Sequence, residues 1–319
     1  ARRPVAVALG LPELNTLSLV LRNGLNVPYA GTLKVEVAKT GGGSGARVVS
    51  GMPVALPAGG ALPLTLAVKP PVTPAGGVLR FTLASAAGGP PVVINKTLPP
   101  MLACPRGTAD PAAFLTSALP ADAARLLVLD QRDQVLPADP TIGWKGPENL
   151  SAKGAISWDE QYLYFAADVI DNIHVQKDAG FEIWTGDAIQ LAVDGGNDAQ
   201  PNRGYDNNDS EYGLALGPAG QPVVWRWQAP AGTATGPIAN AHVRVERTGT
   251  RVVYRFVLPW KELGIQPRPG RVFGFNFIVV DSDSVGREFW IGLTPGIAEA
   301  KLPVFYKKFV LTEAPPPRP

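Results

Sequence analysis

Residues 156–171 read Ile-Ser-Trp-Asp-Glu-Gln-Tyr-Leu-Tyr-Phe-Ala-Ala-Asp-Val-Ile-Asp, and this stretch decides the fold. Residues 155–158 and 163–168 are apolar runs of strand length, which predicts two strands here. Similar runs recur to the end of the chain, at 126–129, 188–193, 211–216, 223–228, 243–247, 252–258, 272–281, 288–293 and 306–311. Ten or eleven short strands in one domain are typical of a large sandwich or jelly roll.

The first hundred residues predict a second, smaller β-sandwich. Residues 32–38 alternate, with Leu33 and Val35 on one face and Lys34 and Glu36 on the other. A period of two with one polar face indicates a half-buried antiparallel strand. About seven such strands, with turn signals between them, are typical of an immunoglobulin-like sandwich.

The two regions are separated by a segment rich in Pro and Ala, and Pro density of this kind makes a semi-rigid spacer. We therefore expect an all-β protein of two β-sandwich domains. The predicted parts are an immunoglobulin-like domain at 1–100, a linker at 101–124, a larger sandwich at 125–312 and a Pro-rich tail at 313–319.

Composition excludes several classes of protein. The 35 Gly and 33 Pro are incompatible with long helices. No run of 18 apolar residues occurs, so we expect no membrane insertion. Cys104 is the sole cysteine and there are two His, which excludes Cys-based and multi-His metal sites. No nucleophile elbow, P-loop or zinc-protease motif occurs, so we expect no enzyme activity.

Charge is distributed unevenly along the chain. Residues 1–100 hold nine Lys and Arg against two acids, whereas the remainder holds 20 Lys and Arg against 25 acids. The basic region has no Trp, and it lacks the stacking aromatics that single-stranded nucleic acid needs. Opposed charges favour docking of one domain on another, within or between subunits. Separate solvation of each surface explains the charges equally well.

Four blocks in the second region resemble the family 9 carbohydrate-binding modules. The first is the 156–171 stretch, with its Trp-Asp and Leu-Tyr pairs and final Asp171. The others follow in family order at 183–194, 254–263 and 273–281. The resemblance covers about residues 125–312. It implies a non-catalytic extracellular or cell-surface β-sandwich that clamps a sugar between two Trp rings, with calcium ions holding loops.

Carried over by position, the resemblance implies that Trp184 is the first clamp residue. Gln190 stands where the family has a Glu that bonds sugar hydroxyls, and Gly213 stands where it has an Arg. Residues 294–301, where the second clamp Trp is expected, contain no aromatic residue. An indole buries the apolar face of a pyranose, so Trp184 is a candidate sugar platform or, equally, a core residue under a loop.

Two further Trp residues are candidates for a replacement platform. Trp225 and Trp227 are two positions apart on one predicted strand, so their side chains point to the same face. They either pack the sandwich or form a flat binding patch, and the sequence leaves both interpretations open.

A run of acids and amides predicts a calcium site, since calcium takes six to eight oxygen ligands. The proposed ligands are Asp206, Asn208, Asp209 and Glu211, with Asp171 and Asp194 in the same or a second site. Asp- and Asn-rich turns are also common without metal.

Two hypotheses for function follow. In the first, the protein binds polysaccharide or another glycan through surface Trp residues. In the second, it is a structural subunit of an extracellular filament or surface layer that assembles head to tail with itself. Both hold if a binding fold is reused as a building block.

Overall fold

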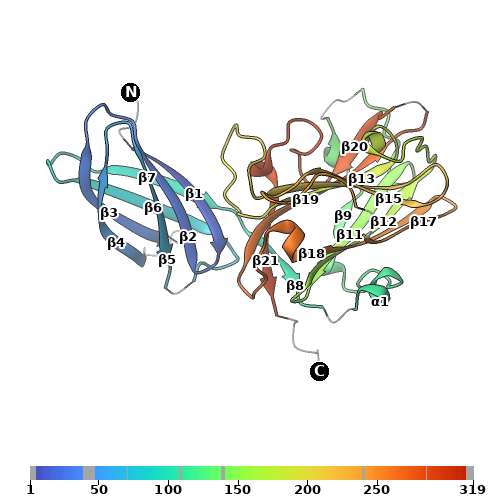
Figure 1. Cartoon of the computed structure of the whole chain (residues 1–319), viewed down its shortest axis with the longest axis horizontal. Helices are drawn as coiled ribbons and strands as arrows, with labels where there is room; N and C mark the ends of the chain where they lie inside the picture. Colours follow the sequence, from blue (N-terminus) through green and yellow to red (C-terminus); the bar gives the residue numbers. More distant parts are fainter. Residues whose placement is uncertain are drawn as a thin grey trace.

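The computed structural model describes residues 5–38, 47–69, 71–107, 110–137, 141–238, 241–284 and 286–313. These residues form two all-β domains, which lie next to one another in Figure 1. Residues 314–319 of the predicted tail lie outside the described residues. None of the described helices combines the length and apolar character that crossing a membrane requires.

The N-terminal domain is a seven-stranded antiparallel sandwich, as the alternation predicted. Leu33 and Val35 are buried in its core, while Lys34 is exposed. One sheet has the order β1-β2-β5 and the other β4-β3-β6-β7. The strands are β1 (Val5–Glu13), β2 (Thr16–Asn23), β3 (Tyr29–Ala38), β4 (Arg47–Leu56), β5 (Ala61–Ala67), β6 (Gly77–Ser85) and β7 (Val92–Leu98).

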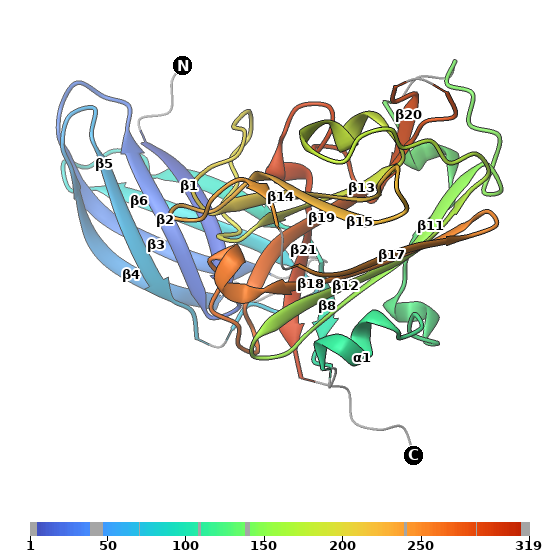
Figure 2. The ribbon, with the colours of Figure 1, turned by 45° about the vertical axis from the view of Figure 1, so that its right-hand side comes forward.

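The C-terminal domain packs a nine-stranded sheet against a five-stranded sheet (Figure 2). Seven strands of the larger sheet follow one another in the order β10 (Val135–Leu136), β20 (Phe289–Gly292), β19 (Val272–Asp281), β13 (Ala188–Asp194), β14 (Asp209–Leu216), β15 (Pro222–Gln228) and β16 (Gly236–Pro237). The other two are β21 (Lys307–Thr312), which also pairs with β19, and β8 (Met101–Pro105), which pairs with β21. The smaller sheet has the order β17 (His242–Thr248), β18 (Arg251–Pro259), β12 (Tyr162–Asp171), β11 (Leu150–Trp158) and β9 (Leu127–Leu129).

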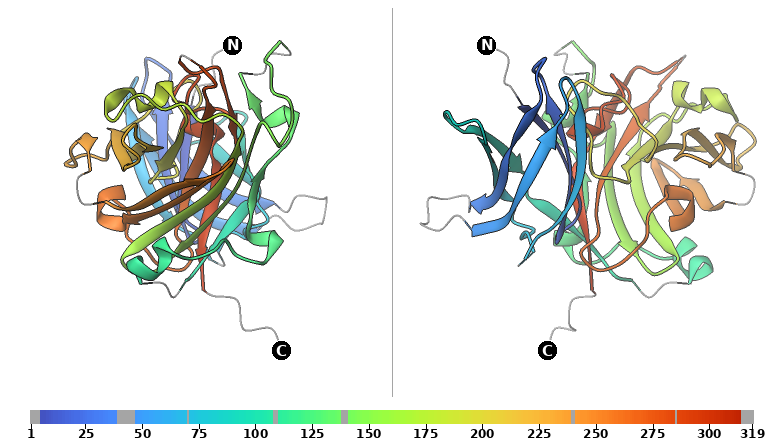
Figure 3. Two further views of the ribbon diagram at one scale, coloured as in Figure 1. Left: turned by 90° about the vertical axis from the view of Figure 1, so that its right-hand side faces the viewer. Right: turned by 60° about the vertical axis from the view of Figure 1, so that its left-hand side comes forward.

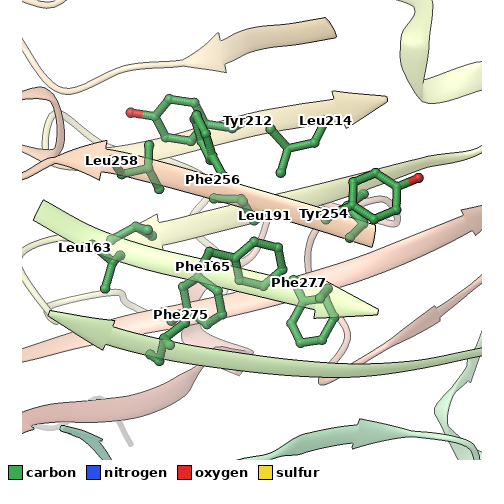
Figure 4. Close-up of a cluster of buried hydrophobic side chains, with 14 of the residues drawn as sticks. Leu163, Phe165, Leu191, Tyr212, Leu214, Tyr254, Phe256, Leu258, Phe275 and Phe277 are labelled. Carbon is green, nitrogen blue, oxygen red and sulfur yellow. The ribbon is translucent and has the colours of Figure 1, made fainter. Parts of the chain in front are cut away.

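Aromatic residues from both sheets fill the space between them (Figure 4). Phe165 on β12 meets Phe275 and Phe277 on β19, with ring centroids 6.0 and 5.3 Å apart. Tyr212 on β14 meets Phe256 on β18 at 5.7 Å. Burying rings of this size supplies most of the hydrophobic stabilisation of such a core.

Residues 101–124 were predicted to be a semi-rigid spacer between the domains, and the described part of this segment packs on the C-terminal domain instead. β8 pairs in parallel with β21, so it belongs to the C-terminal sheet. The short helix α1 (Pro111–Leu115) follows, and its Phe114 packs on Tyr164 with ring centroids 4.9 Å apart. This segment covers the outer surface of the five-stranded sheet (Figure 2). Burial of Cys104 and Phe114 outweighs the extended preference of the prolines.

Short 3-10 helices complete the chain. They are η1 (Ala123–Arg125), η2 (Arg132–Gln134), η3 (Phe181–Thr185), η4 (Trp260–Leu263) and η5 (Pro303–Phe305). Two of them, η3 and η5, lie in the connections that border the nine-stranded sheet.

The two domains contact each other through β1 and the chain around β19. Leu11 and Asn197 exchange hydrogen bonds, from the Leu11 amide to the Asn197 carbonyl at 3.1 Å and from Asn197 Nδ2 to the Leu11 carbonyl at 2.8 Å. Val272 and Val310 of the C-terminal domain lie in the core of the N-terminal domain. The shared core and paired backbone hold the domains together.

Candidate functional site

Alternation along β13 defines a second surface of the nine-stranded sheet. Ile189, Leu191 and Val193 point into the core between the sheets. Ala188 and Gln190, at the alternate positions, point away from the five-stranded sheet. This surface of the nine-stranded sheet is called the outer face below.

Two Trp residues lie together on the outer face. Trp225 and Trp227 on β15 are both half-buried and pack beside Ile183 of η3. Trp227 donates its indole hydrogen to the Phe181 carbonyl at 2.9 Å, and Trp225 meets the Phe181 ring edge-on at 6.1 Å. Both residues therefore belong to the outer face rather than to the core between the sheets.

Gly213 explains how Trp227 fits there. Any Cβ at position 213 would lie 2.3 Å from the Trp227 ring, so the ring occupies the space above this glycine. Position 213, which the resemblance matches to an Arg of the binding modules, is a glycine in this chain. The indole of Trp227 on the neighbouring strand occupies the space over it.

Trp184 also borders the outer face. It lies in η3, half-buried, and the Arg287 guanidinium lies 5.2 Å from its ring centroid. The same guanidinium lies 4.4 Å from the centroid of Trp290, a buried residue of β20. Arg287 therefore contacts both Trp184 and Trp290. Burial lowers the pKa of its guanidinium.

Gln190 is buried on the outer face with an unsatisfied oxygen. It is 2% exposed, and its Oε1 has no hydrogen-bond partner among the described residues. Its register neighbours are Gly213 on β14 and Ile278 on β19, neither of which offers a polar side chain. Leaving such an acceptor unpaired costs about 1–3 kcal/mol. Because the oxygen is shielded from the surface, a donor from outside the chain reaches it only when the side chains that cover it move.

Glu211 lies on the outer face as part of a polar group. Its carboxylate accepts from Tyr205 Oη at 2.8 Å and pairs with Lys301 Nζ at 2.5 Å. Tyr205 Oη also lies 3.0 Å from Tyr306 Oη. The predicted metal ligand Glu211 is therefore an ion-pair partner.

Phe305, an exposed aromatic residue of η5, was not among the residues predicted from the sequence. Phe305 in η5 is 51% exposed, and its ring would lie 3.4 Å from a Cβ added at Gly296. Residues 294–301, where the resemblance places the second clamp residue, contain no aromatic. Phe305 lies four residues beyond this segment and shortly before β21.

Five acidic or imidazole groups gather at one end of the domain. Asp171, His174 and Asp187 form one group whose possible ligand atoms all lie within 4.8 Å of one another, and Asp171, Asp281 and Asp283 form a second. Asp281 is buried, and neither of its carboxyl oxygens has a partner among the described residues.

The electrostatics of this acid cluster favour a cation. Burial, with repulsion from Asp171, raises the pKa of Asp187 to about 9. Burial, with repulsion from Asp283 and Asp171, raises the pKa of Asp281 to about 8. A bound cation relieves both effects, and a donor set dominated by carboxylate oxygens suits calcium.

The other predicted metal ligands make contacts within the chain, and a cation site at 206–211 stays a prediction. Asp206 and Asp209 accept from backbone amides at 3.0 and 2.6 Å, as does Asn208 at 2.6 Å. Asp194 pairs with Lys308 at 3.2 Å. The run 206–209 forms hydrogen-bonded turns, the alternative that its composition allowed.

A cavity of about 920 Å³ lies at a different edge, where β15 and β16 meet β17 and β18. Its buried Arg226 pairs with Glu262 at 2.7 Å and lies over the Tyr212 ring. Because these charges satisfy each other, the cavity is a weaker candidate than the outer face, whose Gln190 oxygen is unpaired.

The fold and the outer face together define a β-sandwich of the carbohydrate-binding-module type. The model of the family described as carbohydrate family 9 binding domain-like matches residues 133–296, just over half of the chain, and the chain belongs to this family. The resemblance seen in the sequence is confirmed.

One curated relative is the endo-1,4-beta-xylanase A of Thermotoga maritima. It is 27% identical over 144 residues, which make up 45% of this chain and 12% of the xylanase. The chain therefore matches only a small part of that enzyme.

Three solved structures are similar to parts of this chain. A family 9 module from Caldicellulosiruptor kristjanssonii in complex with cellotriose is 15% identical, with a TM-score of 0.47, covering 68% of this chain and 95% of that one. A module from the same organism in complex with glucose is 17% identical, with a TM-score of 0.40, covering 56% and 87%. A putative carbohydrate-binding protein from Bacteroides uniformis is 13% identical, with a TM-score of 0.38, covering 58% and 85%.

Proposed function

We propose that the C-terminal domain binds a glycan on its outer face, in an extracellular or cell-surface protein, without catalysing a reaction. The observation that carries the proposal is the buried, unpaired oxygen of Gln190 on the face that also holds Trp225 and Trp227. Membership of a carbohydrate-binding family supports it.

The chemistry of the face fits a sugar ring. The half-buried indoles of Trp184, Trp225 and Trp227 offer flat apolar surfaces to the C–H groups of a pyranose. A sugar hydroxyl donates to Gln190 Oε1 and satisfies an acceptor that the chain leaves unpaired. Phe305 supplies an aromatic edge near the position where the second clamp residue was expected.

The test is isothermal titration with xylohexaose and cellohexaose, chosen because the curated relative is a xylanase. We expect Trp227→Ala to weaken binding by about tenfold or more, as loss of a central aromatic anchor does. Val27→Ala, an exposed apolar change in the N-terminal domain, is the matched control and leaves affinity unchanged. Equal affinity of Trp227→Ala and the parent chain for both sugars contradicts the proposal.

We also propose that the acid cluster binds calcium. Asp171, Asp187, Asp281 and Asp283 supply carboxylate oxygens, and His174 Nδ1 lies 2.9 Å from Asp171 Oδ2. When bound, calcium supplies the positive charge that these buried carboxylates lack. The cluster joins the loop that carries Trp184 to the loop that carries Arg287, so chelation is expected to weaken sugar binding.

Head-to-tail assembly is a second candidate function. An ion pair between the domains joins Glu13 of the N-terminal region to Arg268 of the C-terminal region. The acid here comes from the basic region and the base from the acidic region, which is the reverse of the overall charges. Most charged groups of the two regions thus form no direct ion pair between the domains in the described chain, which favours contact between copies. Light scattering over a concentration series, with and without calcium, tests this. Open-ended growth supports assembly, and a constant mass of 33.6 kDa excludes it.

A further inference from the structure

A groove of about 630 Å³ runs between the two domains. One wall is the outward surface of β1 and β2, where Ala6, Ala8 and Ser18 have small side chains. The other wall is the loop between β13 and β14, which contributes Gln200, Arg203, Tyr205 and Asp206. Figure 3 shows this loop beside the blue strands of the N-terminal domain.

The walls of the groove are fixed in place. Gln200 Nε2 donates to the Leu9 carbonyl at 3.3 Å, in addition to the exchange between Leu11 and Asn197. Gly10 approaches so closely that an added Cβ would lie 2.7 Å from the Asp198 Cβ. A groove held by backbone hydrogen bonds and close packing is already formed before a ligand arrives, which lowers the entropic cost of binding.

The groove lies at one end of the outer face. Gly213, Glu211 and Asp209 occupy alternate positions of β14 on this side of the sheet, about 7 Å apart along the strand, and all three are buried. Trp227 covers Gly213 at one end of this line, and Asp209 lines the groove at the other. Tyr205 joins the two regions, because it bonds Glu211 and also lines the groove.

We propose that this groove binds further units of the polysaccharide chain that the outer face holds, so that the N-terminal domain forms part of the binding site. The inference rests on the function proposed above and extends it from one sugar ring to a chain. It gives the N-terminal domain a role in recognition.

The lining of the groove suits a neutral polyhydroxyl chain. The lining has two Arg, Arg22 and Arg203, and three Asp, Asp198, Asp206 and Asp209, so the groove has no excess of positive charge that would select a polyanion. Tyr205 offers an aromatic surface and Gln200 an amide, the groups that sugar hydroxyls and C–H faces contact. The small residues of β1 leave room for the chain.

A pair of matched variants tests the inference. Ala6 and Ala61 are both exposed and both face Arg22 in register, from opposite sides of β2. Ala6 lines the groove and Ala61 does not. Ala6→Trp obstructs the groove, whereas Ala61→Trp adds the same side chain to the same sheet outside it. Thermal unfolding establishes that both variants are folded.

Binding is measured with xylobiose, xylohexaose, cellobiose and cellohexaose. In whichever of the two series binds, we expect the hexasaccharide to bind more tightly than the disaccharide. Ala6→Trp lowers its affinity about tenfold and leaves the disaccharide unchanged, and Ala61→Trp changes neither. Arg22→Ala, which removes a side chain of the groove, also weakens only the longer sugar.

Two results overturn the inference, and they differ. If Ala6→Trp leaves the hexasaccharide affinity intact while Trp227→Ala abolishes binding, the outer face binds sugar and the groove does not. If the parent chain binds no oligosaccharide of either series, the proposed function fails and this inference fails with it.

Discussion

The two outward surfaces of the C-terminal sandwich bury polar groups in opposite ways. On the five-stranded sheet, Arg255 is 1% exposed and donates to Asp168 and to the Ser117 and Ala167 carbonyls. On the nine-stranded sheet, Gln190 is equally buried and its Oε1 has no partner in the described chain.

The difference separates a surface completed by the chain from one that is open to a ligand. The segment of α1 packs on the first surface, and its Ser117 carbonyl accepts from the buried guanidinium, as do Asp168 and the Ala167 carbonyl of the sheet. The second surface keeps half-buried aromatic rings and an unpaired acceptor. An unpaired buried group is not sufficient by itself, since the hydroxyls of Tyr29 and Tyr212 in the two cores are unpaired as well. On the outer face the unpaired Gln190 oxygen coincides with half-buried aromatic rings, and this combination favours a ligand.

The largest expected effect concerns two carboxyls, the half-buried Asp168 and the buried Asp209. Asp168 pairs with Arg251 and Arg255, whereas Asp209 lies near Asp194 and Asp206. Burial raises the pKa of Asp209 to about 8, above about 3.9 in the unfolded chain. The folded state thus holds a proton that the unfolded state releases, so this contribution is complete below pH 4 and is lost as the pH rises through about 8.

We expect the free energy of unfolding to fall across this window, by at most about 1.4 kcal/mol per pH unit for one proton. Urea unfolding at several pH values, in saturating calcium, measures the slope. Asp209→Asn makes the slope shallower, and Asp133→Asn, at an exposed carboxyl outside this group, does not. A parent slope equal to that of Asp209→Asn shows that Asp209 is ionised in the folded state.

The covered surface provides the next effect. Arg255→Ala removes the buried partner of Asp168, and it removes the donor to the Ser117 carbonyl of the covering segment and to the Ala167 carbonyl of β12. We expect a loss of about 3–5 kcal/mol in the free energy of unfolding. Arg251→Ala removes the other partner of the same carboxylate, but Arg251 is 55% exposed, so the loss is about 0–1 kcal/mol. Similar losses for both variants contradict the assignment of Arg255 as a structural anchor.

Calcium gives an intermediate effect on the open side. At a hundredfold excess over its dissociation constant, a ligand of the folded state stabilises it by about 2.7 kcal/mol. We expect calcium to raise the melting temperature of the parent chain by several degrees. Asp281→Asn removes a carboxylate from the cluster and abolishes the shift, while Asp133→Asn, outside it, does not. A shift of equal size in Asp281→Asn excludes the cluster as the site.

Much of the fold was predictable because strands carry their signal locally. The predicted strands at 155–158 and 163–168 lie within β11 and β12, and both sandwiches are as expected. The segment 101–124 was misjudged because Pro density describes local stiffness. The position of the segment depends on where Cys104 and Phe114 are buried, and this is determined by the tertiary structure.

The candidate site was predictable only in part. Trp184, Gln190, Trp225 and Trp227 were found from a family pattern and from strand periodicity. The acid cluster was not, because Asp187 and Asp281 are far apart in sequence and meet only where β13 pairs with β19, with Ala188 opposite Val280. Arg287 was missed for the same reason, since its contact with Trp184 depends on how two loops meet.

The smallest expected effect is the most direct test of the comparison. Gln190→Met keeps the length of the side chain and removes the unpaired oxygen. If that oxygen is unsatisfied in the free protein, the variant gains about 1 kcal/mol in the free energy of unfolding, because an apolar group of similar shape is cheaper to bury.

The same variant is expected to bind oligosaccharides about tenfold more weakly, since a sugar hydroxyl loses its acceptor. Urea unfolding and titration calorimetry on one preparation measure both quantities, and Gln190→Glu, which keeps acceptor oxygens, is the control for sugar binding. Opposite changes in stability and affinity are the signature of a residue kept for a ligand. A loss of stability in Gln190→Met instead shows that the amide is already paired within the chain, and the two surfaces would then be alike.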